Sequence, residues 1–346
     1  MKADIAIIGD RFMLPSEFET AIRRKCGSAP TIRSHQTPWP DVAMQHGYAE
    51  AGMDGLKEYQ GHADEVVAQV GDAAIVVTQL APFSDGVMSR LPNLRMIAAS
   101  RGGPVNIDIA AARRRDILVV NTPGRNASAV AEFTLGAILA QTRLITRGHE
   151  ALRRGVWRGD LYRADMTGEE LCEMTVGVVG YGHIGAKVVR ILKAFGCRTL
   201  VCDPYVAISP DDVEDGVEQV ALPRILAESD VVTLHARVTA ETRGFIGAEQ
   251  FAAMKQGCYF VNTARGPLVD YAALTQALKS RHLRGAAIDT FGVEPVPAHW
   301  ELLRLDNVTL TPHIAGASAR TIRFAAEAVA EEVRRFLAGA PPLNPC

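Results

Sequence analysis

Long apolar runs, an excess of either charge and closely spaced cysteines are all absent from this sequence. The 346 residues hold 37 Lys and Arg against 39 Asp and Glu, a formal net charge of −2, so the basic surplus typical of nucleic-acid partners is missing. No apolar run approaches the ~20 residues needed to cross a bilayer, and Asp4 interrupts the first apolar stretch before it could serve as a signal peptide. We therefore expect neither a nucleic-acid nor a membrane partner.

The six cysteines are scattered and include no Cys-x-x-Cys pair. They are too sparse for a disulfide scaffold, and no spacing of cysteines with the nine histidines matches a zinc site. Reduced thiols are the simplest interpretation. The sequence thus predicts a cytoplasmic protein without a metal site.

The sequence does contain a repeated alternation of short apolar runs with helix-length amphipathic stretches. Strands that are apolar on both faces and separated by helices are typical of parallel sheets with crossover helices. Ten strands are too many for one compact sheet, so we predict an α/β fold with two doubly wound parallel-sheet domains. The apolar runs lie at residues 5–8, 74–77, 94–98, 117–120, 176–179, 199–202, 231–234, 259–261, 286–288 and 308–310.

Turn residues at 121–128 mark a seam between the two predicted domains. After them, residues 129–147 predict one long helix that is apolar over most of its circumference and therefore buried. The next stretch, 147–163, is rich in arginine and holds Trp157; it is either a solvated cationic patch or a dimer contact. Residues 318–337 predict a final helix that packs by one face, and 41–61 predict an irregular loop region.

A glycine-rich motif follows the predicted strand at 176–179. It reads Gly180-Tyr-Gly182-His-Ile-Gly185 and opens an amphipathic helix. Gly180 permits a tight turn, Gly182 lets the backbone approach a pyrophosphate, and Gly185 lets the helix pack against the strand. The free amides and the dipole of the helix N-terminus then bind the phosphate anion. The motif predicts a Rossmann dinucleotide-binding domain.

Asp203 completes the context of the glycine motif, because it ends the next predicted strand. Its carboxylate would accept hydrogen bonds from both hydroxyls of a ribose and would repel a 2′-phosphate. The sequence therefore predicts NAD, rather than NADP, as the cofactor.

Three further segments each follow a predicted strand, at the carboxyl edge where open α/β sheets bind ligands. They read Asn262-Thr-Ala-Arg265-Gly-Pro, Asp289-Thr-Phe-Gly-Val-Glu294-Pro and Thr311-Pro-His313-Ile-Ala-Gly. With the glycine motif, they make the chain resemble the D-isomer-specific 2-hydroxyacid dehydrogenase family, of the phosphoglycerate dehydrogenase-like type, from about residue 97 to the last helix. The resemblance implies an NAD-dependent oxidoreductase that interconverts a D-2-hydroxy acid and its 2-oxo acid.

The chemistry of that reaction suits the residues of these segments, and the resemblance implies the same roles. His313 would exchange a proton with the C2 oxygen, because imidazole titrates near neutral pH. Glu294 would favour the imidazolium and orient the ring. Arg265 would polarise the C2 oxygen and hold the substrate carboxylate with its fork of donors. Arg265, Glu294 and His313 are therefore the predicted catalytic residues.

The resemblance also implies a wider set of cofactor contacts and a domain arrangement. The NAD-binding domain, residues 124–317, would be inserted into a flavodoxin-like substrate domain formed by residues 1–123 and 318–346, and the protein would be a homodimer. Beyond Gly180, Gly182, Gly185 and Asp203, the implied cofactor residues are His183, Ile184, His235, Ala236, Thr263, Ala264, Arg265, Asp289, His313 and Gly316. His235 is equally well explained as a wall residue of the domain.

The predicted substrate loop departs from the family pattern. The family typically has Gly-x-Gly-x-Asp-Asn-hydrophobic-Asp, whereas this chain has Arg101-Gly102-Gly103-Pro-Val105-Asn-Ile-Asp. The resemblance implies that Gly102 and Gly103 bind the substrate carboxylate through their amides. Arg101 would then contact a second anionic or hydroxyl-rich group, as in a phosphorylated or sugar-derived acid, or would point to solvent or pair across the seam between the domains instead.

Two other functions fit the same motifs. A phosphite dehydrogenase-like oxidoreductase would keep the same catalytic residues. An NAD(H)-sensing, corepressor-like binding protein would keep the fold and the residues but act by docking. The 2-hydroxyacid dehydrogenase remains the leading hypothesis.

Overall fold

The computed structural model describes residues 4–39, 53 and 55–346, and it divides the chain into two compact units. Unit 1 joins residues 1–126 to residues 317–346, and unit 2 is the continuous segment 127–316. The sequence analysis placed the two boundaries at 123/124 and 317/318, whereas the compact units meet at 126/127 and 316/317. Residues 40–52 and 54, which include most of the predicted loop at 41–61, lie outside the described residues.

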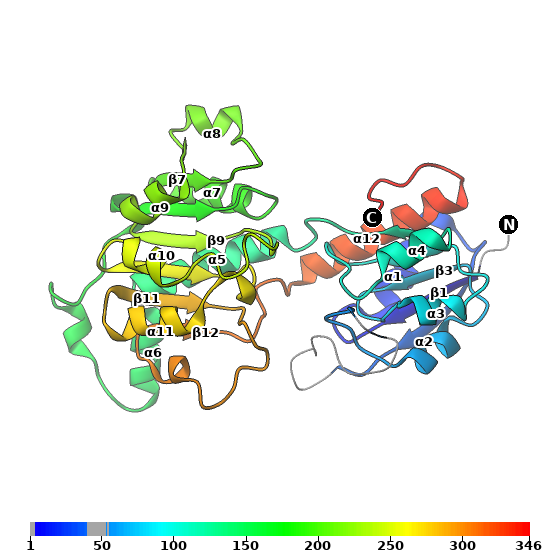
Figure 1. Ribbon diagram of the computed structural model, residues 1–346, viewed down its shortest axis with the longest axis horizontal. Helices are drawn as coiled ribbons and strands as arrows, with labels where there is room; N and C mark the ends of the chain where they lie inside the picture. The colour runs from blue at the N-terminus through cyan, green and yellow to red at the C-terminus, as the bar shows by residue number, and fades with distance from the viewer. Residues whose placement is uncertain (1–3, 40–52, 54) are drawn as a thin grey trace. The chain divides into compact units, whose positions relative to one another are not determined.

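Unit 1 is built on a five-stranded parallel sheet in the order β2-β1-β3-β4-β5 (Figure 1). This is the doubly wound, flavodoxin-like strand order, in which the chain leaves β1 on one side for β2 and returns on its other side as β3. The elements are β1 (Asp4–Gly9), α1 (Pro15–Cys26), β2 (Thr31–Gln36), α2 (Ala63–Val70), β3 (Ile75–Thr78), α3 (Asp85–Ser89), β4 (Met96–Ala99), α4 (Ile109–Arg114), β5 (Leu118–Val120) and, from the end of the chain, α12 (Ala319–Leu337).

Successive side chains of each strand point to opposite faces of this sheet, and both faces are covered by apolar cores. Ile5 and Ile7 of β1 join α1 and α12 in one core cluster, whereas Ala6 and Ile8 join α2, α3 and α4 in the other. Ser318 caps α12 by accepting a hydrogen bond from the Thr321 amide. Because α12 packs against α1 (Figure 1), the end of the chain completes unit 1.

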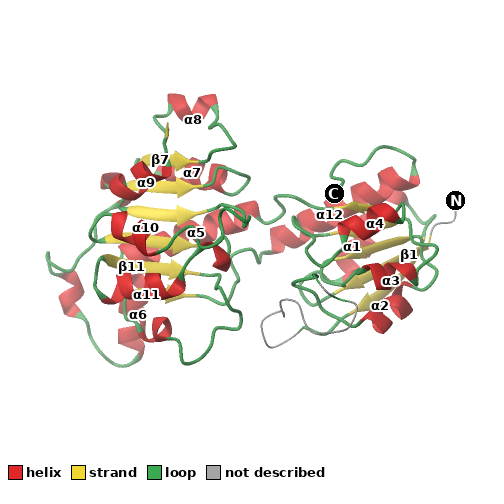
Figure 2. Ribbon diagram, in the orientation of Figure 1, coloured by secondary structure: helices red, strands yellow, loops and turns green. Residues whose placement is uncertain are grey.

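Unit 2 is built on a seven-stranded parallel sheet in the order β12-β11-β10-β9-β6-β7-β8 (Figure 2). One face is covered by α5 and α7 and the other by α9, α10 and α11. The elements are α5 (Ala127–Thr142), α6 (Ile145–Arg153), β6 (Thr175–Val179), α7 (Gly185–Ala194), β7 (Arg198–Cys202), α8 (Pro210–Glu214), β8 (Glu218–Gln219), α9 (Leu222–Glu228), β9 (Val231–Leu234), α10 (Ala248–Ala253), β10 (Cys258–Asn262), α11 (Tyr271–Lys279), β11 (Leu283–Ile288) and β12 (Val308–Leu310).

The structure corrects the single helix predicted at 129–147. α5 ends at Thr142 and a separate α6 begins at Ile145, because Leu144 adopts a left-handed backbone conformation with φ 56°. The prediction that this apolar segment forms a buried helix nevertheless holds for α5, which packs within unit 2 against α7, β10 and β11.

All ten predicted strands form, but two strands were missed. β2 and β8 carry polar sequences, TIRSHQ and EQ, and each lies at the edge of its sheet. An edge strand has a single neighbour and a larger exposed surface, so it lacks the continuous apolar run that identified the others. Within the described part of the chain, every helix is too short or too polar to span a bilayer.

Candidate active site

The predicted site residues of unit 2 gather along one edge of its sheet. The strands are all parallel, so their carboxyl ends meet at the same edge, where α/β sheets bind ligands. The residues directly beyond these ends are Gly180 (β6), Asp203 (β7), His235 (β9), Thr263 (β10), Asp289 (β11) and, shortly after β12, His313.

The structure shows why each of the three positions of the motif is occupied by glycine. Gly180 has φ 101°, and a Cβ there would lie 2.6 Å from the carbonyl carbon of His235. A Cβ on Gly185, at the start of α7, would lie 1.9 Å from the oxygen of Gly180. A Cβ on Gly182, in contrast, would have nothing within 4 Å. Packing therefore requires Gly180 and Gly185, whereas Gly182 faces open space and is suited to the close approach of a ligand.

The loop and the start of α7 fit the pyrophosphate of a dinucleotide. His183 is exposed and Ile184 is half-buried between Gly182 and the first turn of the helix. A ten-residue helix presents free backbone amides and the positive end of its dipole at this point. The open space beside Gly182 is the room that the phosphates would need.

Asp203 closes the loop beyond β6. Its Oδ2 accepts a hydrogen bond from the amide of Tyr181 at 2.7 Å, and its Oδ1 accepts from the amides of Tyr205 and Val206 at 2.9 and 3.0 Å. The side chain is half-buried and each carboxylate oxygen has two lone pairs, so capacity remains for ribose hydroxyls. Asp203 thus links the glycine motif to β7 at the position where the ribose is expected.

Arg265 projects from a tight turn after β10. Asn262 holds this turn, because its Oδ1 accepts from the amide of Ala264 at 3.1 Å and its Nδ2 donates to the carbonyl of Arg265 at 3.1 Å. A Cβ on Gly266 would lie 1.8 Å from the oxygen of Phe291. The pair Arg265-Gly266 therefore lies directly against the segment that carries Glu294, and the Arg265 residue is exposed.

Asp289 organises the segment that carries His313. Its Oδ1 accepts from Thr311 Oγ1 at 2.7 Å and from the Ile314 amide at 2.9 Å, and its Oδ2 accepts from the Ala315 amide at 2.9 Å. The carbonyl of Asp289 also accepts from the His313 amide at 2.8 Å. These bonds hold His313 at φ 54°, a left-handed conformation that costs roughly 1–2 kcal/mol in a residue with a Cβ. The structure gives Asp289, 1% exposed, a role in positioning His313 that the resemblance did not imply.

His313 and Glu294 form a hydrogen-bonded pair. His313 Nδ1 lies 2.9 Å from Glu294 Oε2, and Glu294 Oε1 accepts from the Phe291 amide at 2.8 Å. Burial by itself would lower the pKa of His313, but the hydrogen bond and the negative charge of Glu294 outweigh burial and raise this pKa above its usual value. With Nδ1 occupied, Nε2 is left for a substrate. The pair is suited to proton exchange near neutral pH.

His235 is a different kind of histidine. Its Nε2 lies 3.1 Å from Thr233 Oγ1, and its buried Nδ1 has no hydrogen-bond partner among the described residues. Burial lowers its pKa to about 3, so the ring is neutral at physiological pH. Its backbone and that of Ala236 lie against Gly180. The structure thus places His235 beside the glycine loop, where either interpretation of the sequence, cofactor contact or wall residue, is possible.

Sequence reasoning missed Thr134 and Tyr271, which hydrogen-bond to residues at this edge of the sheet. Thr263 Oγ1 lies 2.7 Å from Thr134 Oγ1 of α5, and the hydroxyl of Tyr271 donates to the carbonyl of Thr290. Both contacts join residues far apart in the chain, so no local pattern indicates them. Gly316, the last residue of unit 2, ends the His313 segment.

Unit 1 carries the predicted substrate loop after β4. Gly102 and Gly103 are exposed, and a Cβ on Gly103 would have nothing within 4 Å. Arg101, predicted to contact a second substrate group, is instead 8% exposed and forms an ion pair with Glu58, to whose carbonyl it also donates at 3.1 Å. Arg101 therefore neither points to solvent nor pairs across the seam between the two units, because Glu58 belongs to unit 1 as well. Among the described residues, no group of His, Cys, Asp and Glu is arranged to hold a metal ion.

Comparison with known proteins agrees with this geometry. The family model described as D-isomer specific 2-hydroxyacid dehydrogenase, NAD binding domain, matches residues 135–315. A glyoxylate reductase from Korarchaeum cryptofilum is 39% identical over 282 residues, which cover 81% of this chain and 84% of that protein.

Solved structures show the same similarity in three dimensions. The TT0316 protein from Thermus thermophilus is 30% identical, with a TM-score of 0.80 over 98% of this chain and 99% of that one. A D-lactate dehydrogenase from Aquifex aeolicus, solved with NAD and lactic acid, is 25% identical, with a TM-score of 0.74 over 96% of both chains.

Proposed function

Since this chain belongs to the D-isomer specific 2-hydroxyacid dehydrogenase family and is an NAD-dependent oxidoreductase, we propose that Arg265, Glu294 and His313 carry the interconversion of a D-2-hydroxy acid and its 2-oxo acid. The observation that carries this assignment is the Glu294–His313 pair at 2.9 Å, next to the Arg265 turn. The dinucleotide, when bound, supplies or accepts the hydride at C2 of the substrate.

The remaining steps belong to side chains of this protein. During reduction, the His313 imidazolium donates the proton on Nε2 to the C2 oxygen as the hydride arrives at C2. During oxidation, neutral His313 takes the hydroxyl proton as the hydride leaves. The Glu294 carboxylate stabilises the imidazolium and fixes the ring through Nδ1. Both directions balance, because one hydride and one proton are transferred in each.

Arg265 stabilises the oxygen on which charge develops. Its guanidinium is suited to hold the substrate carboxylate and the C2 oxygen together, since it offers parallel donors in a fixed plane. In unit 1, the exposed amides of Gly102 and Gly103 are the proposed carboxylate ligands. For the cofactor, we propose contacts at the glycine motif, with Asp203 selecting NAD over NADP at the ribose.

For the substrate, we propose an acid that carries a polar or anionic group beyond C2, such as a phosphorylated or sugar-derived acid. The relative from Korarchaeum cryptofilum is named for glyoxylate, which has no such group. This chain, however, places Arg101 where the family pattern has a glycine, and this arginine, although paired with Glu58, makes the loop that we assign to the substrate more polar.

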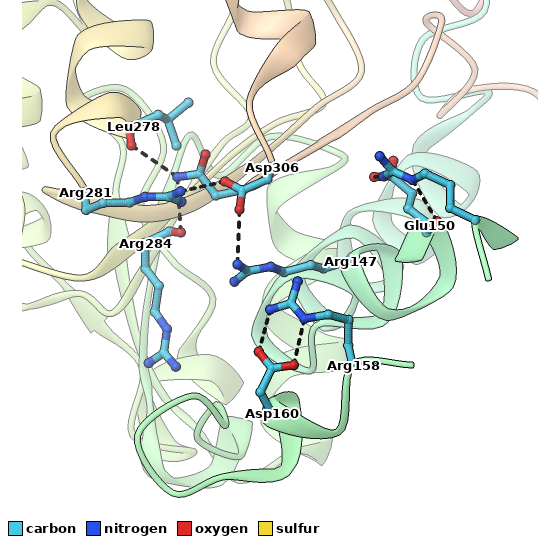
Figure 3. A network of polar contacts seen from close by, with 10 residues as sticks. Arg147, Glu150, Arg158, Asp160, Leu278, Arg281, Arg284 and Asp306 are labelled. Atoms are coloured by element: carbon cyan, nitrogen blue, oxygen red, sulfur yellow. Dashed lines mark hydrogen bonds and ion pairs between the residues drawn. The ribbon is translucent and has the colours of Figure 1, made fainter. Parts of the chain in front are cut away.

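We also propose that the protein is a cytoplasmic homodimer. All six cysteines are free, as expected in a reducing compartment. Figure 3 shows that three arginines near α6 are paired within unit 2: Arg147 and Arg281 with Asp306, and Arg158 with Asp160. The charge of these three arginines is therefore balanced by carboxylates of the same unit. The segment also exposes large apolar side chains, which a second copy of the chain would cover: Ile145 (58%), Leu152 (59%), Val156 (50%), Trp157 (83%) and Tyr162 (95%).

The test of the function is NADH consumption by the purified protein with a panel of 2-oxo acids, with and without His313→Ala. We expect turnover by the wild type, and we expect His313→Ala to lose about 10²-fold or more in kcat while the dissociation constant for NADH stays the same. Tight NADH binding without turnover of any 2-oxo acid would favour the corepressor-like alternative. NAD-dependent oxidation of phosphite would favour the phosphite dehydrogenase-like one.

A further inference from the structure

Unit 2 contains a cavity of about 610 Å³ at the edge of its sheet opposite to the proposed active site. Its walls are the starts of β10, β11 and β12, the end of α5, the start of α6 and residues 164–169, all of which belong to unit 2. A strand of six residues, such as β11, spans roughly 15–20 Å, so the cavity is separate from the carboxyl ends of the strands. Its volume is typical of a site for a small molecule.

Three arginines line this cavity and keep most of their hydrogen-bond donors unused. Arg147 and Arg281 each donate to Asp306 through one nitrogen, at 3.1 and 2.6 Å (Figure 3). Arg147 Nε is buried and has no partner among the described residues. Arg284 donates from Nη2 to two backbone carbonyls of the segment after α6, at 3.2 and 2.7 Å. Because a guanidinium carries five N–H donors, each of the three can also bind an oxyanion.

The carboxylates of the cavity wall leave a positive charge in excess. Asp306 is shared between two arginines, and Asp165 is paired with Arg163 at 2.6 Å. The third lining acid, Glu169, is exposed, so water screens its charge. With Arg163 included, four arginines face three carboxylates at this wall. The charge of the cavity therefore favours an anionic ligand.

Two buried polar side chains of the wall have an oxygen without a hydrogen-bond partner among the described residues. Tyr259 is 3% exposed and Asn307 is 7% exposed, and the oxygens concerned are Tyr259 Oη and Asn307 Oδ1. Burial raises the pKa of Tyr259, while the charge of Arg284 lowers it and that of Glu169 raises it. The hydroxyl therefore stays protonated and can donate. Buried polar atoms normally have partners, so these two atoms indicate that a polar ligand completes the wall.

The cavity also offers a place for the carbon part of a ligand. Leu144 and Val308 line it on the side of α6 and β12. None of the five exposed apolar side chains that we assign to the dimer contact is among its lining residues. A ligand in the cavity and a second copy of the chain would therefore use different side chains.

We propose that this cavity is a second binding site, which takes an organic anion of metabolite size, either a phosphate ester or a carboxylate. The oxygens of the anion accept hydrogen bonds from Arg147, Arg281 and Arg284, whose planar forks of donors match carboxylate and phosphate geometry. The site goes beyond the proposed function, because it lies at the amino-terminal edge of the sheet and includes no residue of the proposed catalytic set.

Calorimetric titration of the full-length, NADH-loaded protein tests the proposal without any need for turnover. The probes are glucose 6-phosphate, citrate and neutral glucose. We expect at least one of the two anions to bind and glucose not to bind, and the stronger anion distinguishes a phosphate from a carboxylate. Arg284→Gln should weaken the binding of that anion by about tenfold or more, because charge-assisted hydrogen bonds are lost. Arg265→Gln, at the proposed active site, should leave this binding unchanged.

Two further variants separate ligand binding from folding and from general charge attraction. Tyr259→Phe removes a hydroxyl that has no partner among the described residues, so it should leave the free energy of unfolding nearly unchanged yet weaken the anion several-fold. Arg224→Gln removes an exposed arginine of α9, bonded to Glu228 at 2.6 Å, and should have no effect.

Three results would overturn the proposal. The first is that neither anion binds to the wild type. The second is that Arg284→Gln binds the anion as tightly as the wild type, or that Arg265→Gln weakens it as much as Arg284→Gln does, since the anion would then occupy the active site. The third is an equal loss in Arg224→Gln and Arg284→Gln, which would show attraction by the net charge of the protein only.

Discussion

Replacing Glu294 by Gln is the most informative perturbation of the proposed site, because it removes one charge and leaves the shape nearly unchanged. The amide oxygen of Gln can still accept from the Phe291 amide, as Glu294 Oε1 does at 2.8 Å. What is lost is the negative charge that faces His313 Nδ1 at 2.9 Å.

The expected size of the effect of Glu294→Gln follows from how exposed the side chains of His313 and Glu294 are. Hydrogen bonds to charged groups contribute roughly 1.5–3 kcal/mol. The side chain of His313 is 37% exposed and that of Glu294 is 11% exposed, so solvent screening places this pair at the lower end of the range. A loss of about 1.4 kcal/mol corresponds to a tenfold change in rate. We therefore expect kcat/KM for reduction at slightly alkaline pH to fall about tenfold in Glu294→Gln.

The effect of Glu294 on the pKa of His313 gives the direction in which the pH profiles of Glu294→Gln move. Glu294 raises the pKa of His313, so the imidazolium that reduction requires persists to higher pH and is lost as the pH rises through that pKa. Without the charge the pKa falls, and the alkaline limb of the reduction profile moves to lower pH. Oxidation requires neutral His313, so the acidic limb of its profile also moves to lower pH.

The assay is kcat/KM from NADH absorbance in both directions, from about pH 5 to about pH 9, around the usual pKa of histidine. Glu301→Gln is the matched control, because Glu301 makes an exposed ion pair with Lys279 at 2.6 Å. If both limbs stay in place in Glu294→Gln, the role of Glu294 as the partner of His313 is refuted.

Three other changes probe the cofactor site and the fold. Asp203→Ala should shift the NADH/NADPH ratio of kcat/KM toward NADPH by about tenfold or more, because charge-assisted hydrogen bonds to the ribose and repulsion of the 2′-phosphate are both lost; an unaltered ratio would count against the ribose assignment. Gly182→Ala should fold normally, since its Cβ would meet nothing within 4 Å, yet weaken NADH binding on the order of tenfold in a fluorescence titration; unweakened binding would mean that the pyrophosphate lies elsewhere. Phe18→Ala, in the α1–α12 core of unit 1 and 0% exposed, should lower the free energy of unfolding by about 3–5 kcal/mol in a denaturant titration, and a loss below about 1 kcal/mol would contradict the packing described for α12.

The sequence by itself determined the fold class, the ten strands of apolar sequence and the order of the motifs along the chain. These features are local or periodic. A strand buried on both faces needs a continuous apolar run, and a phosphate loop needs glycines at set spacings, so both can be recognised without knowledge of distant residues. The positions of Gly180 and Arg265 beyond strand ends, and of Gly185 at the start of a helix, follow in the same way.

The tertiary structure alone decided which side chains meet. Arg101 pairs with Glu58, Arg125 bonds to Gln79, and Asp289 holds the His313 segment rather than standing free. Edge strands β2 and β8 also escaped sequence analysis, because exposure on an open edge removes the apolar signal. The physical reason is common to all these cases: the energy of a charge or a polar group depends on neighbours that the chain brings together only on folding, and no local periodicity records them.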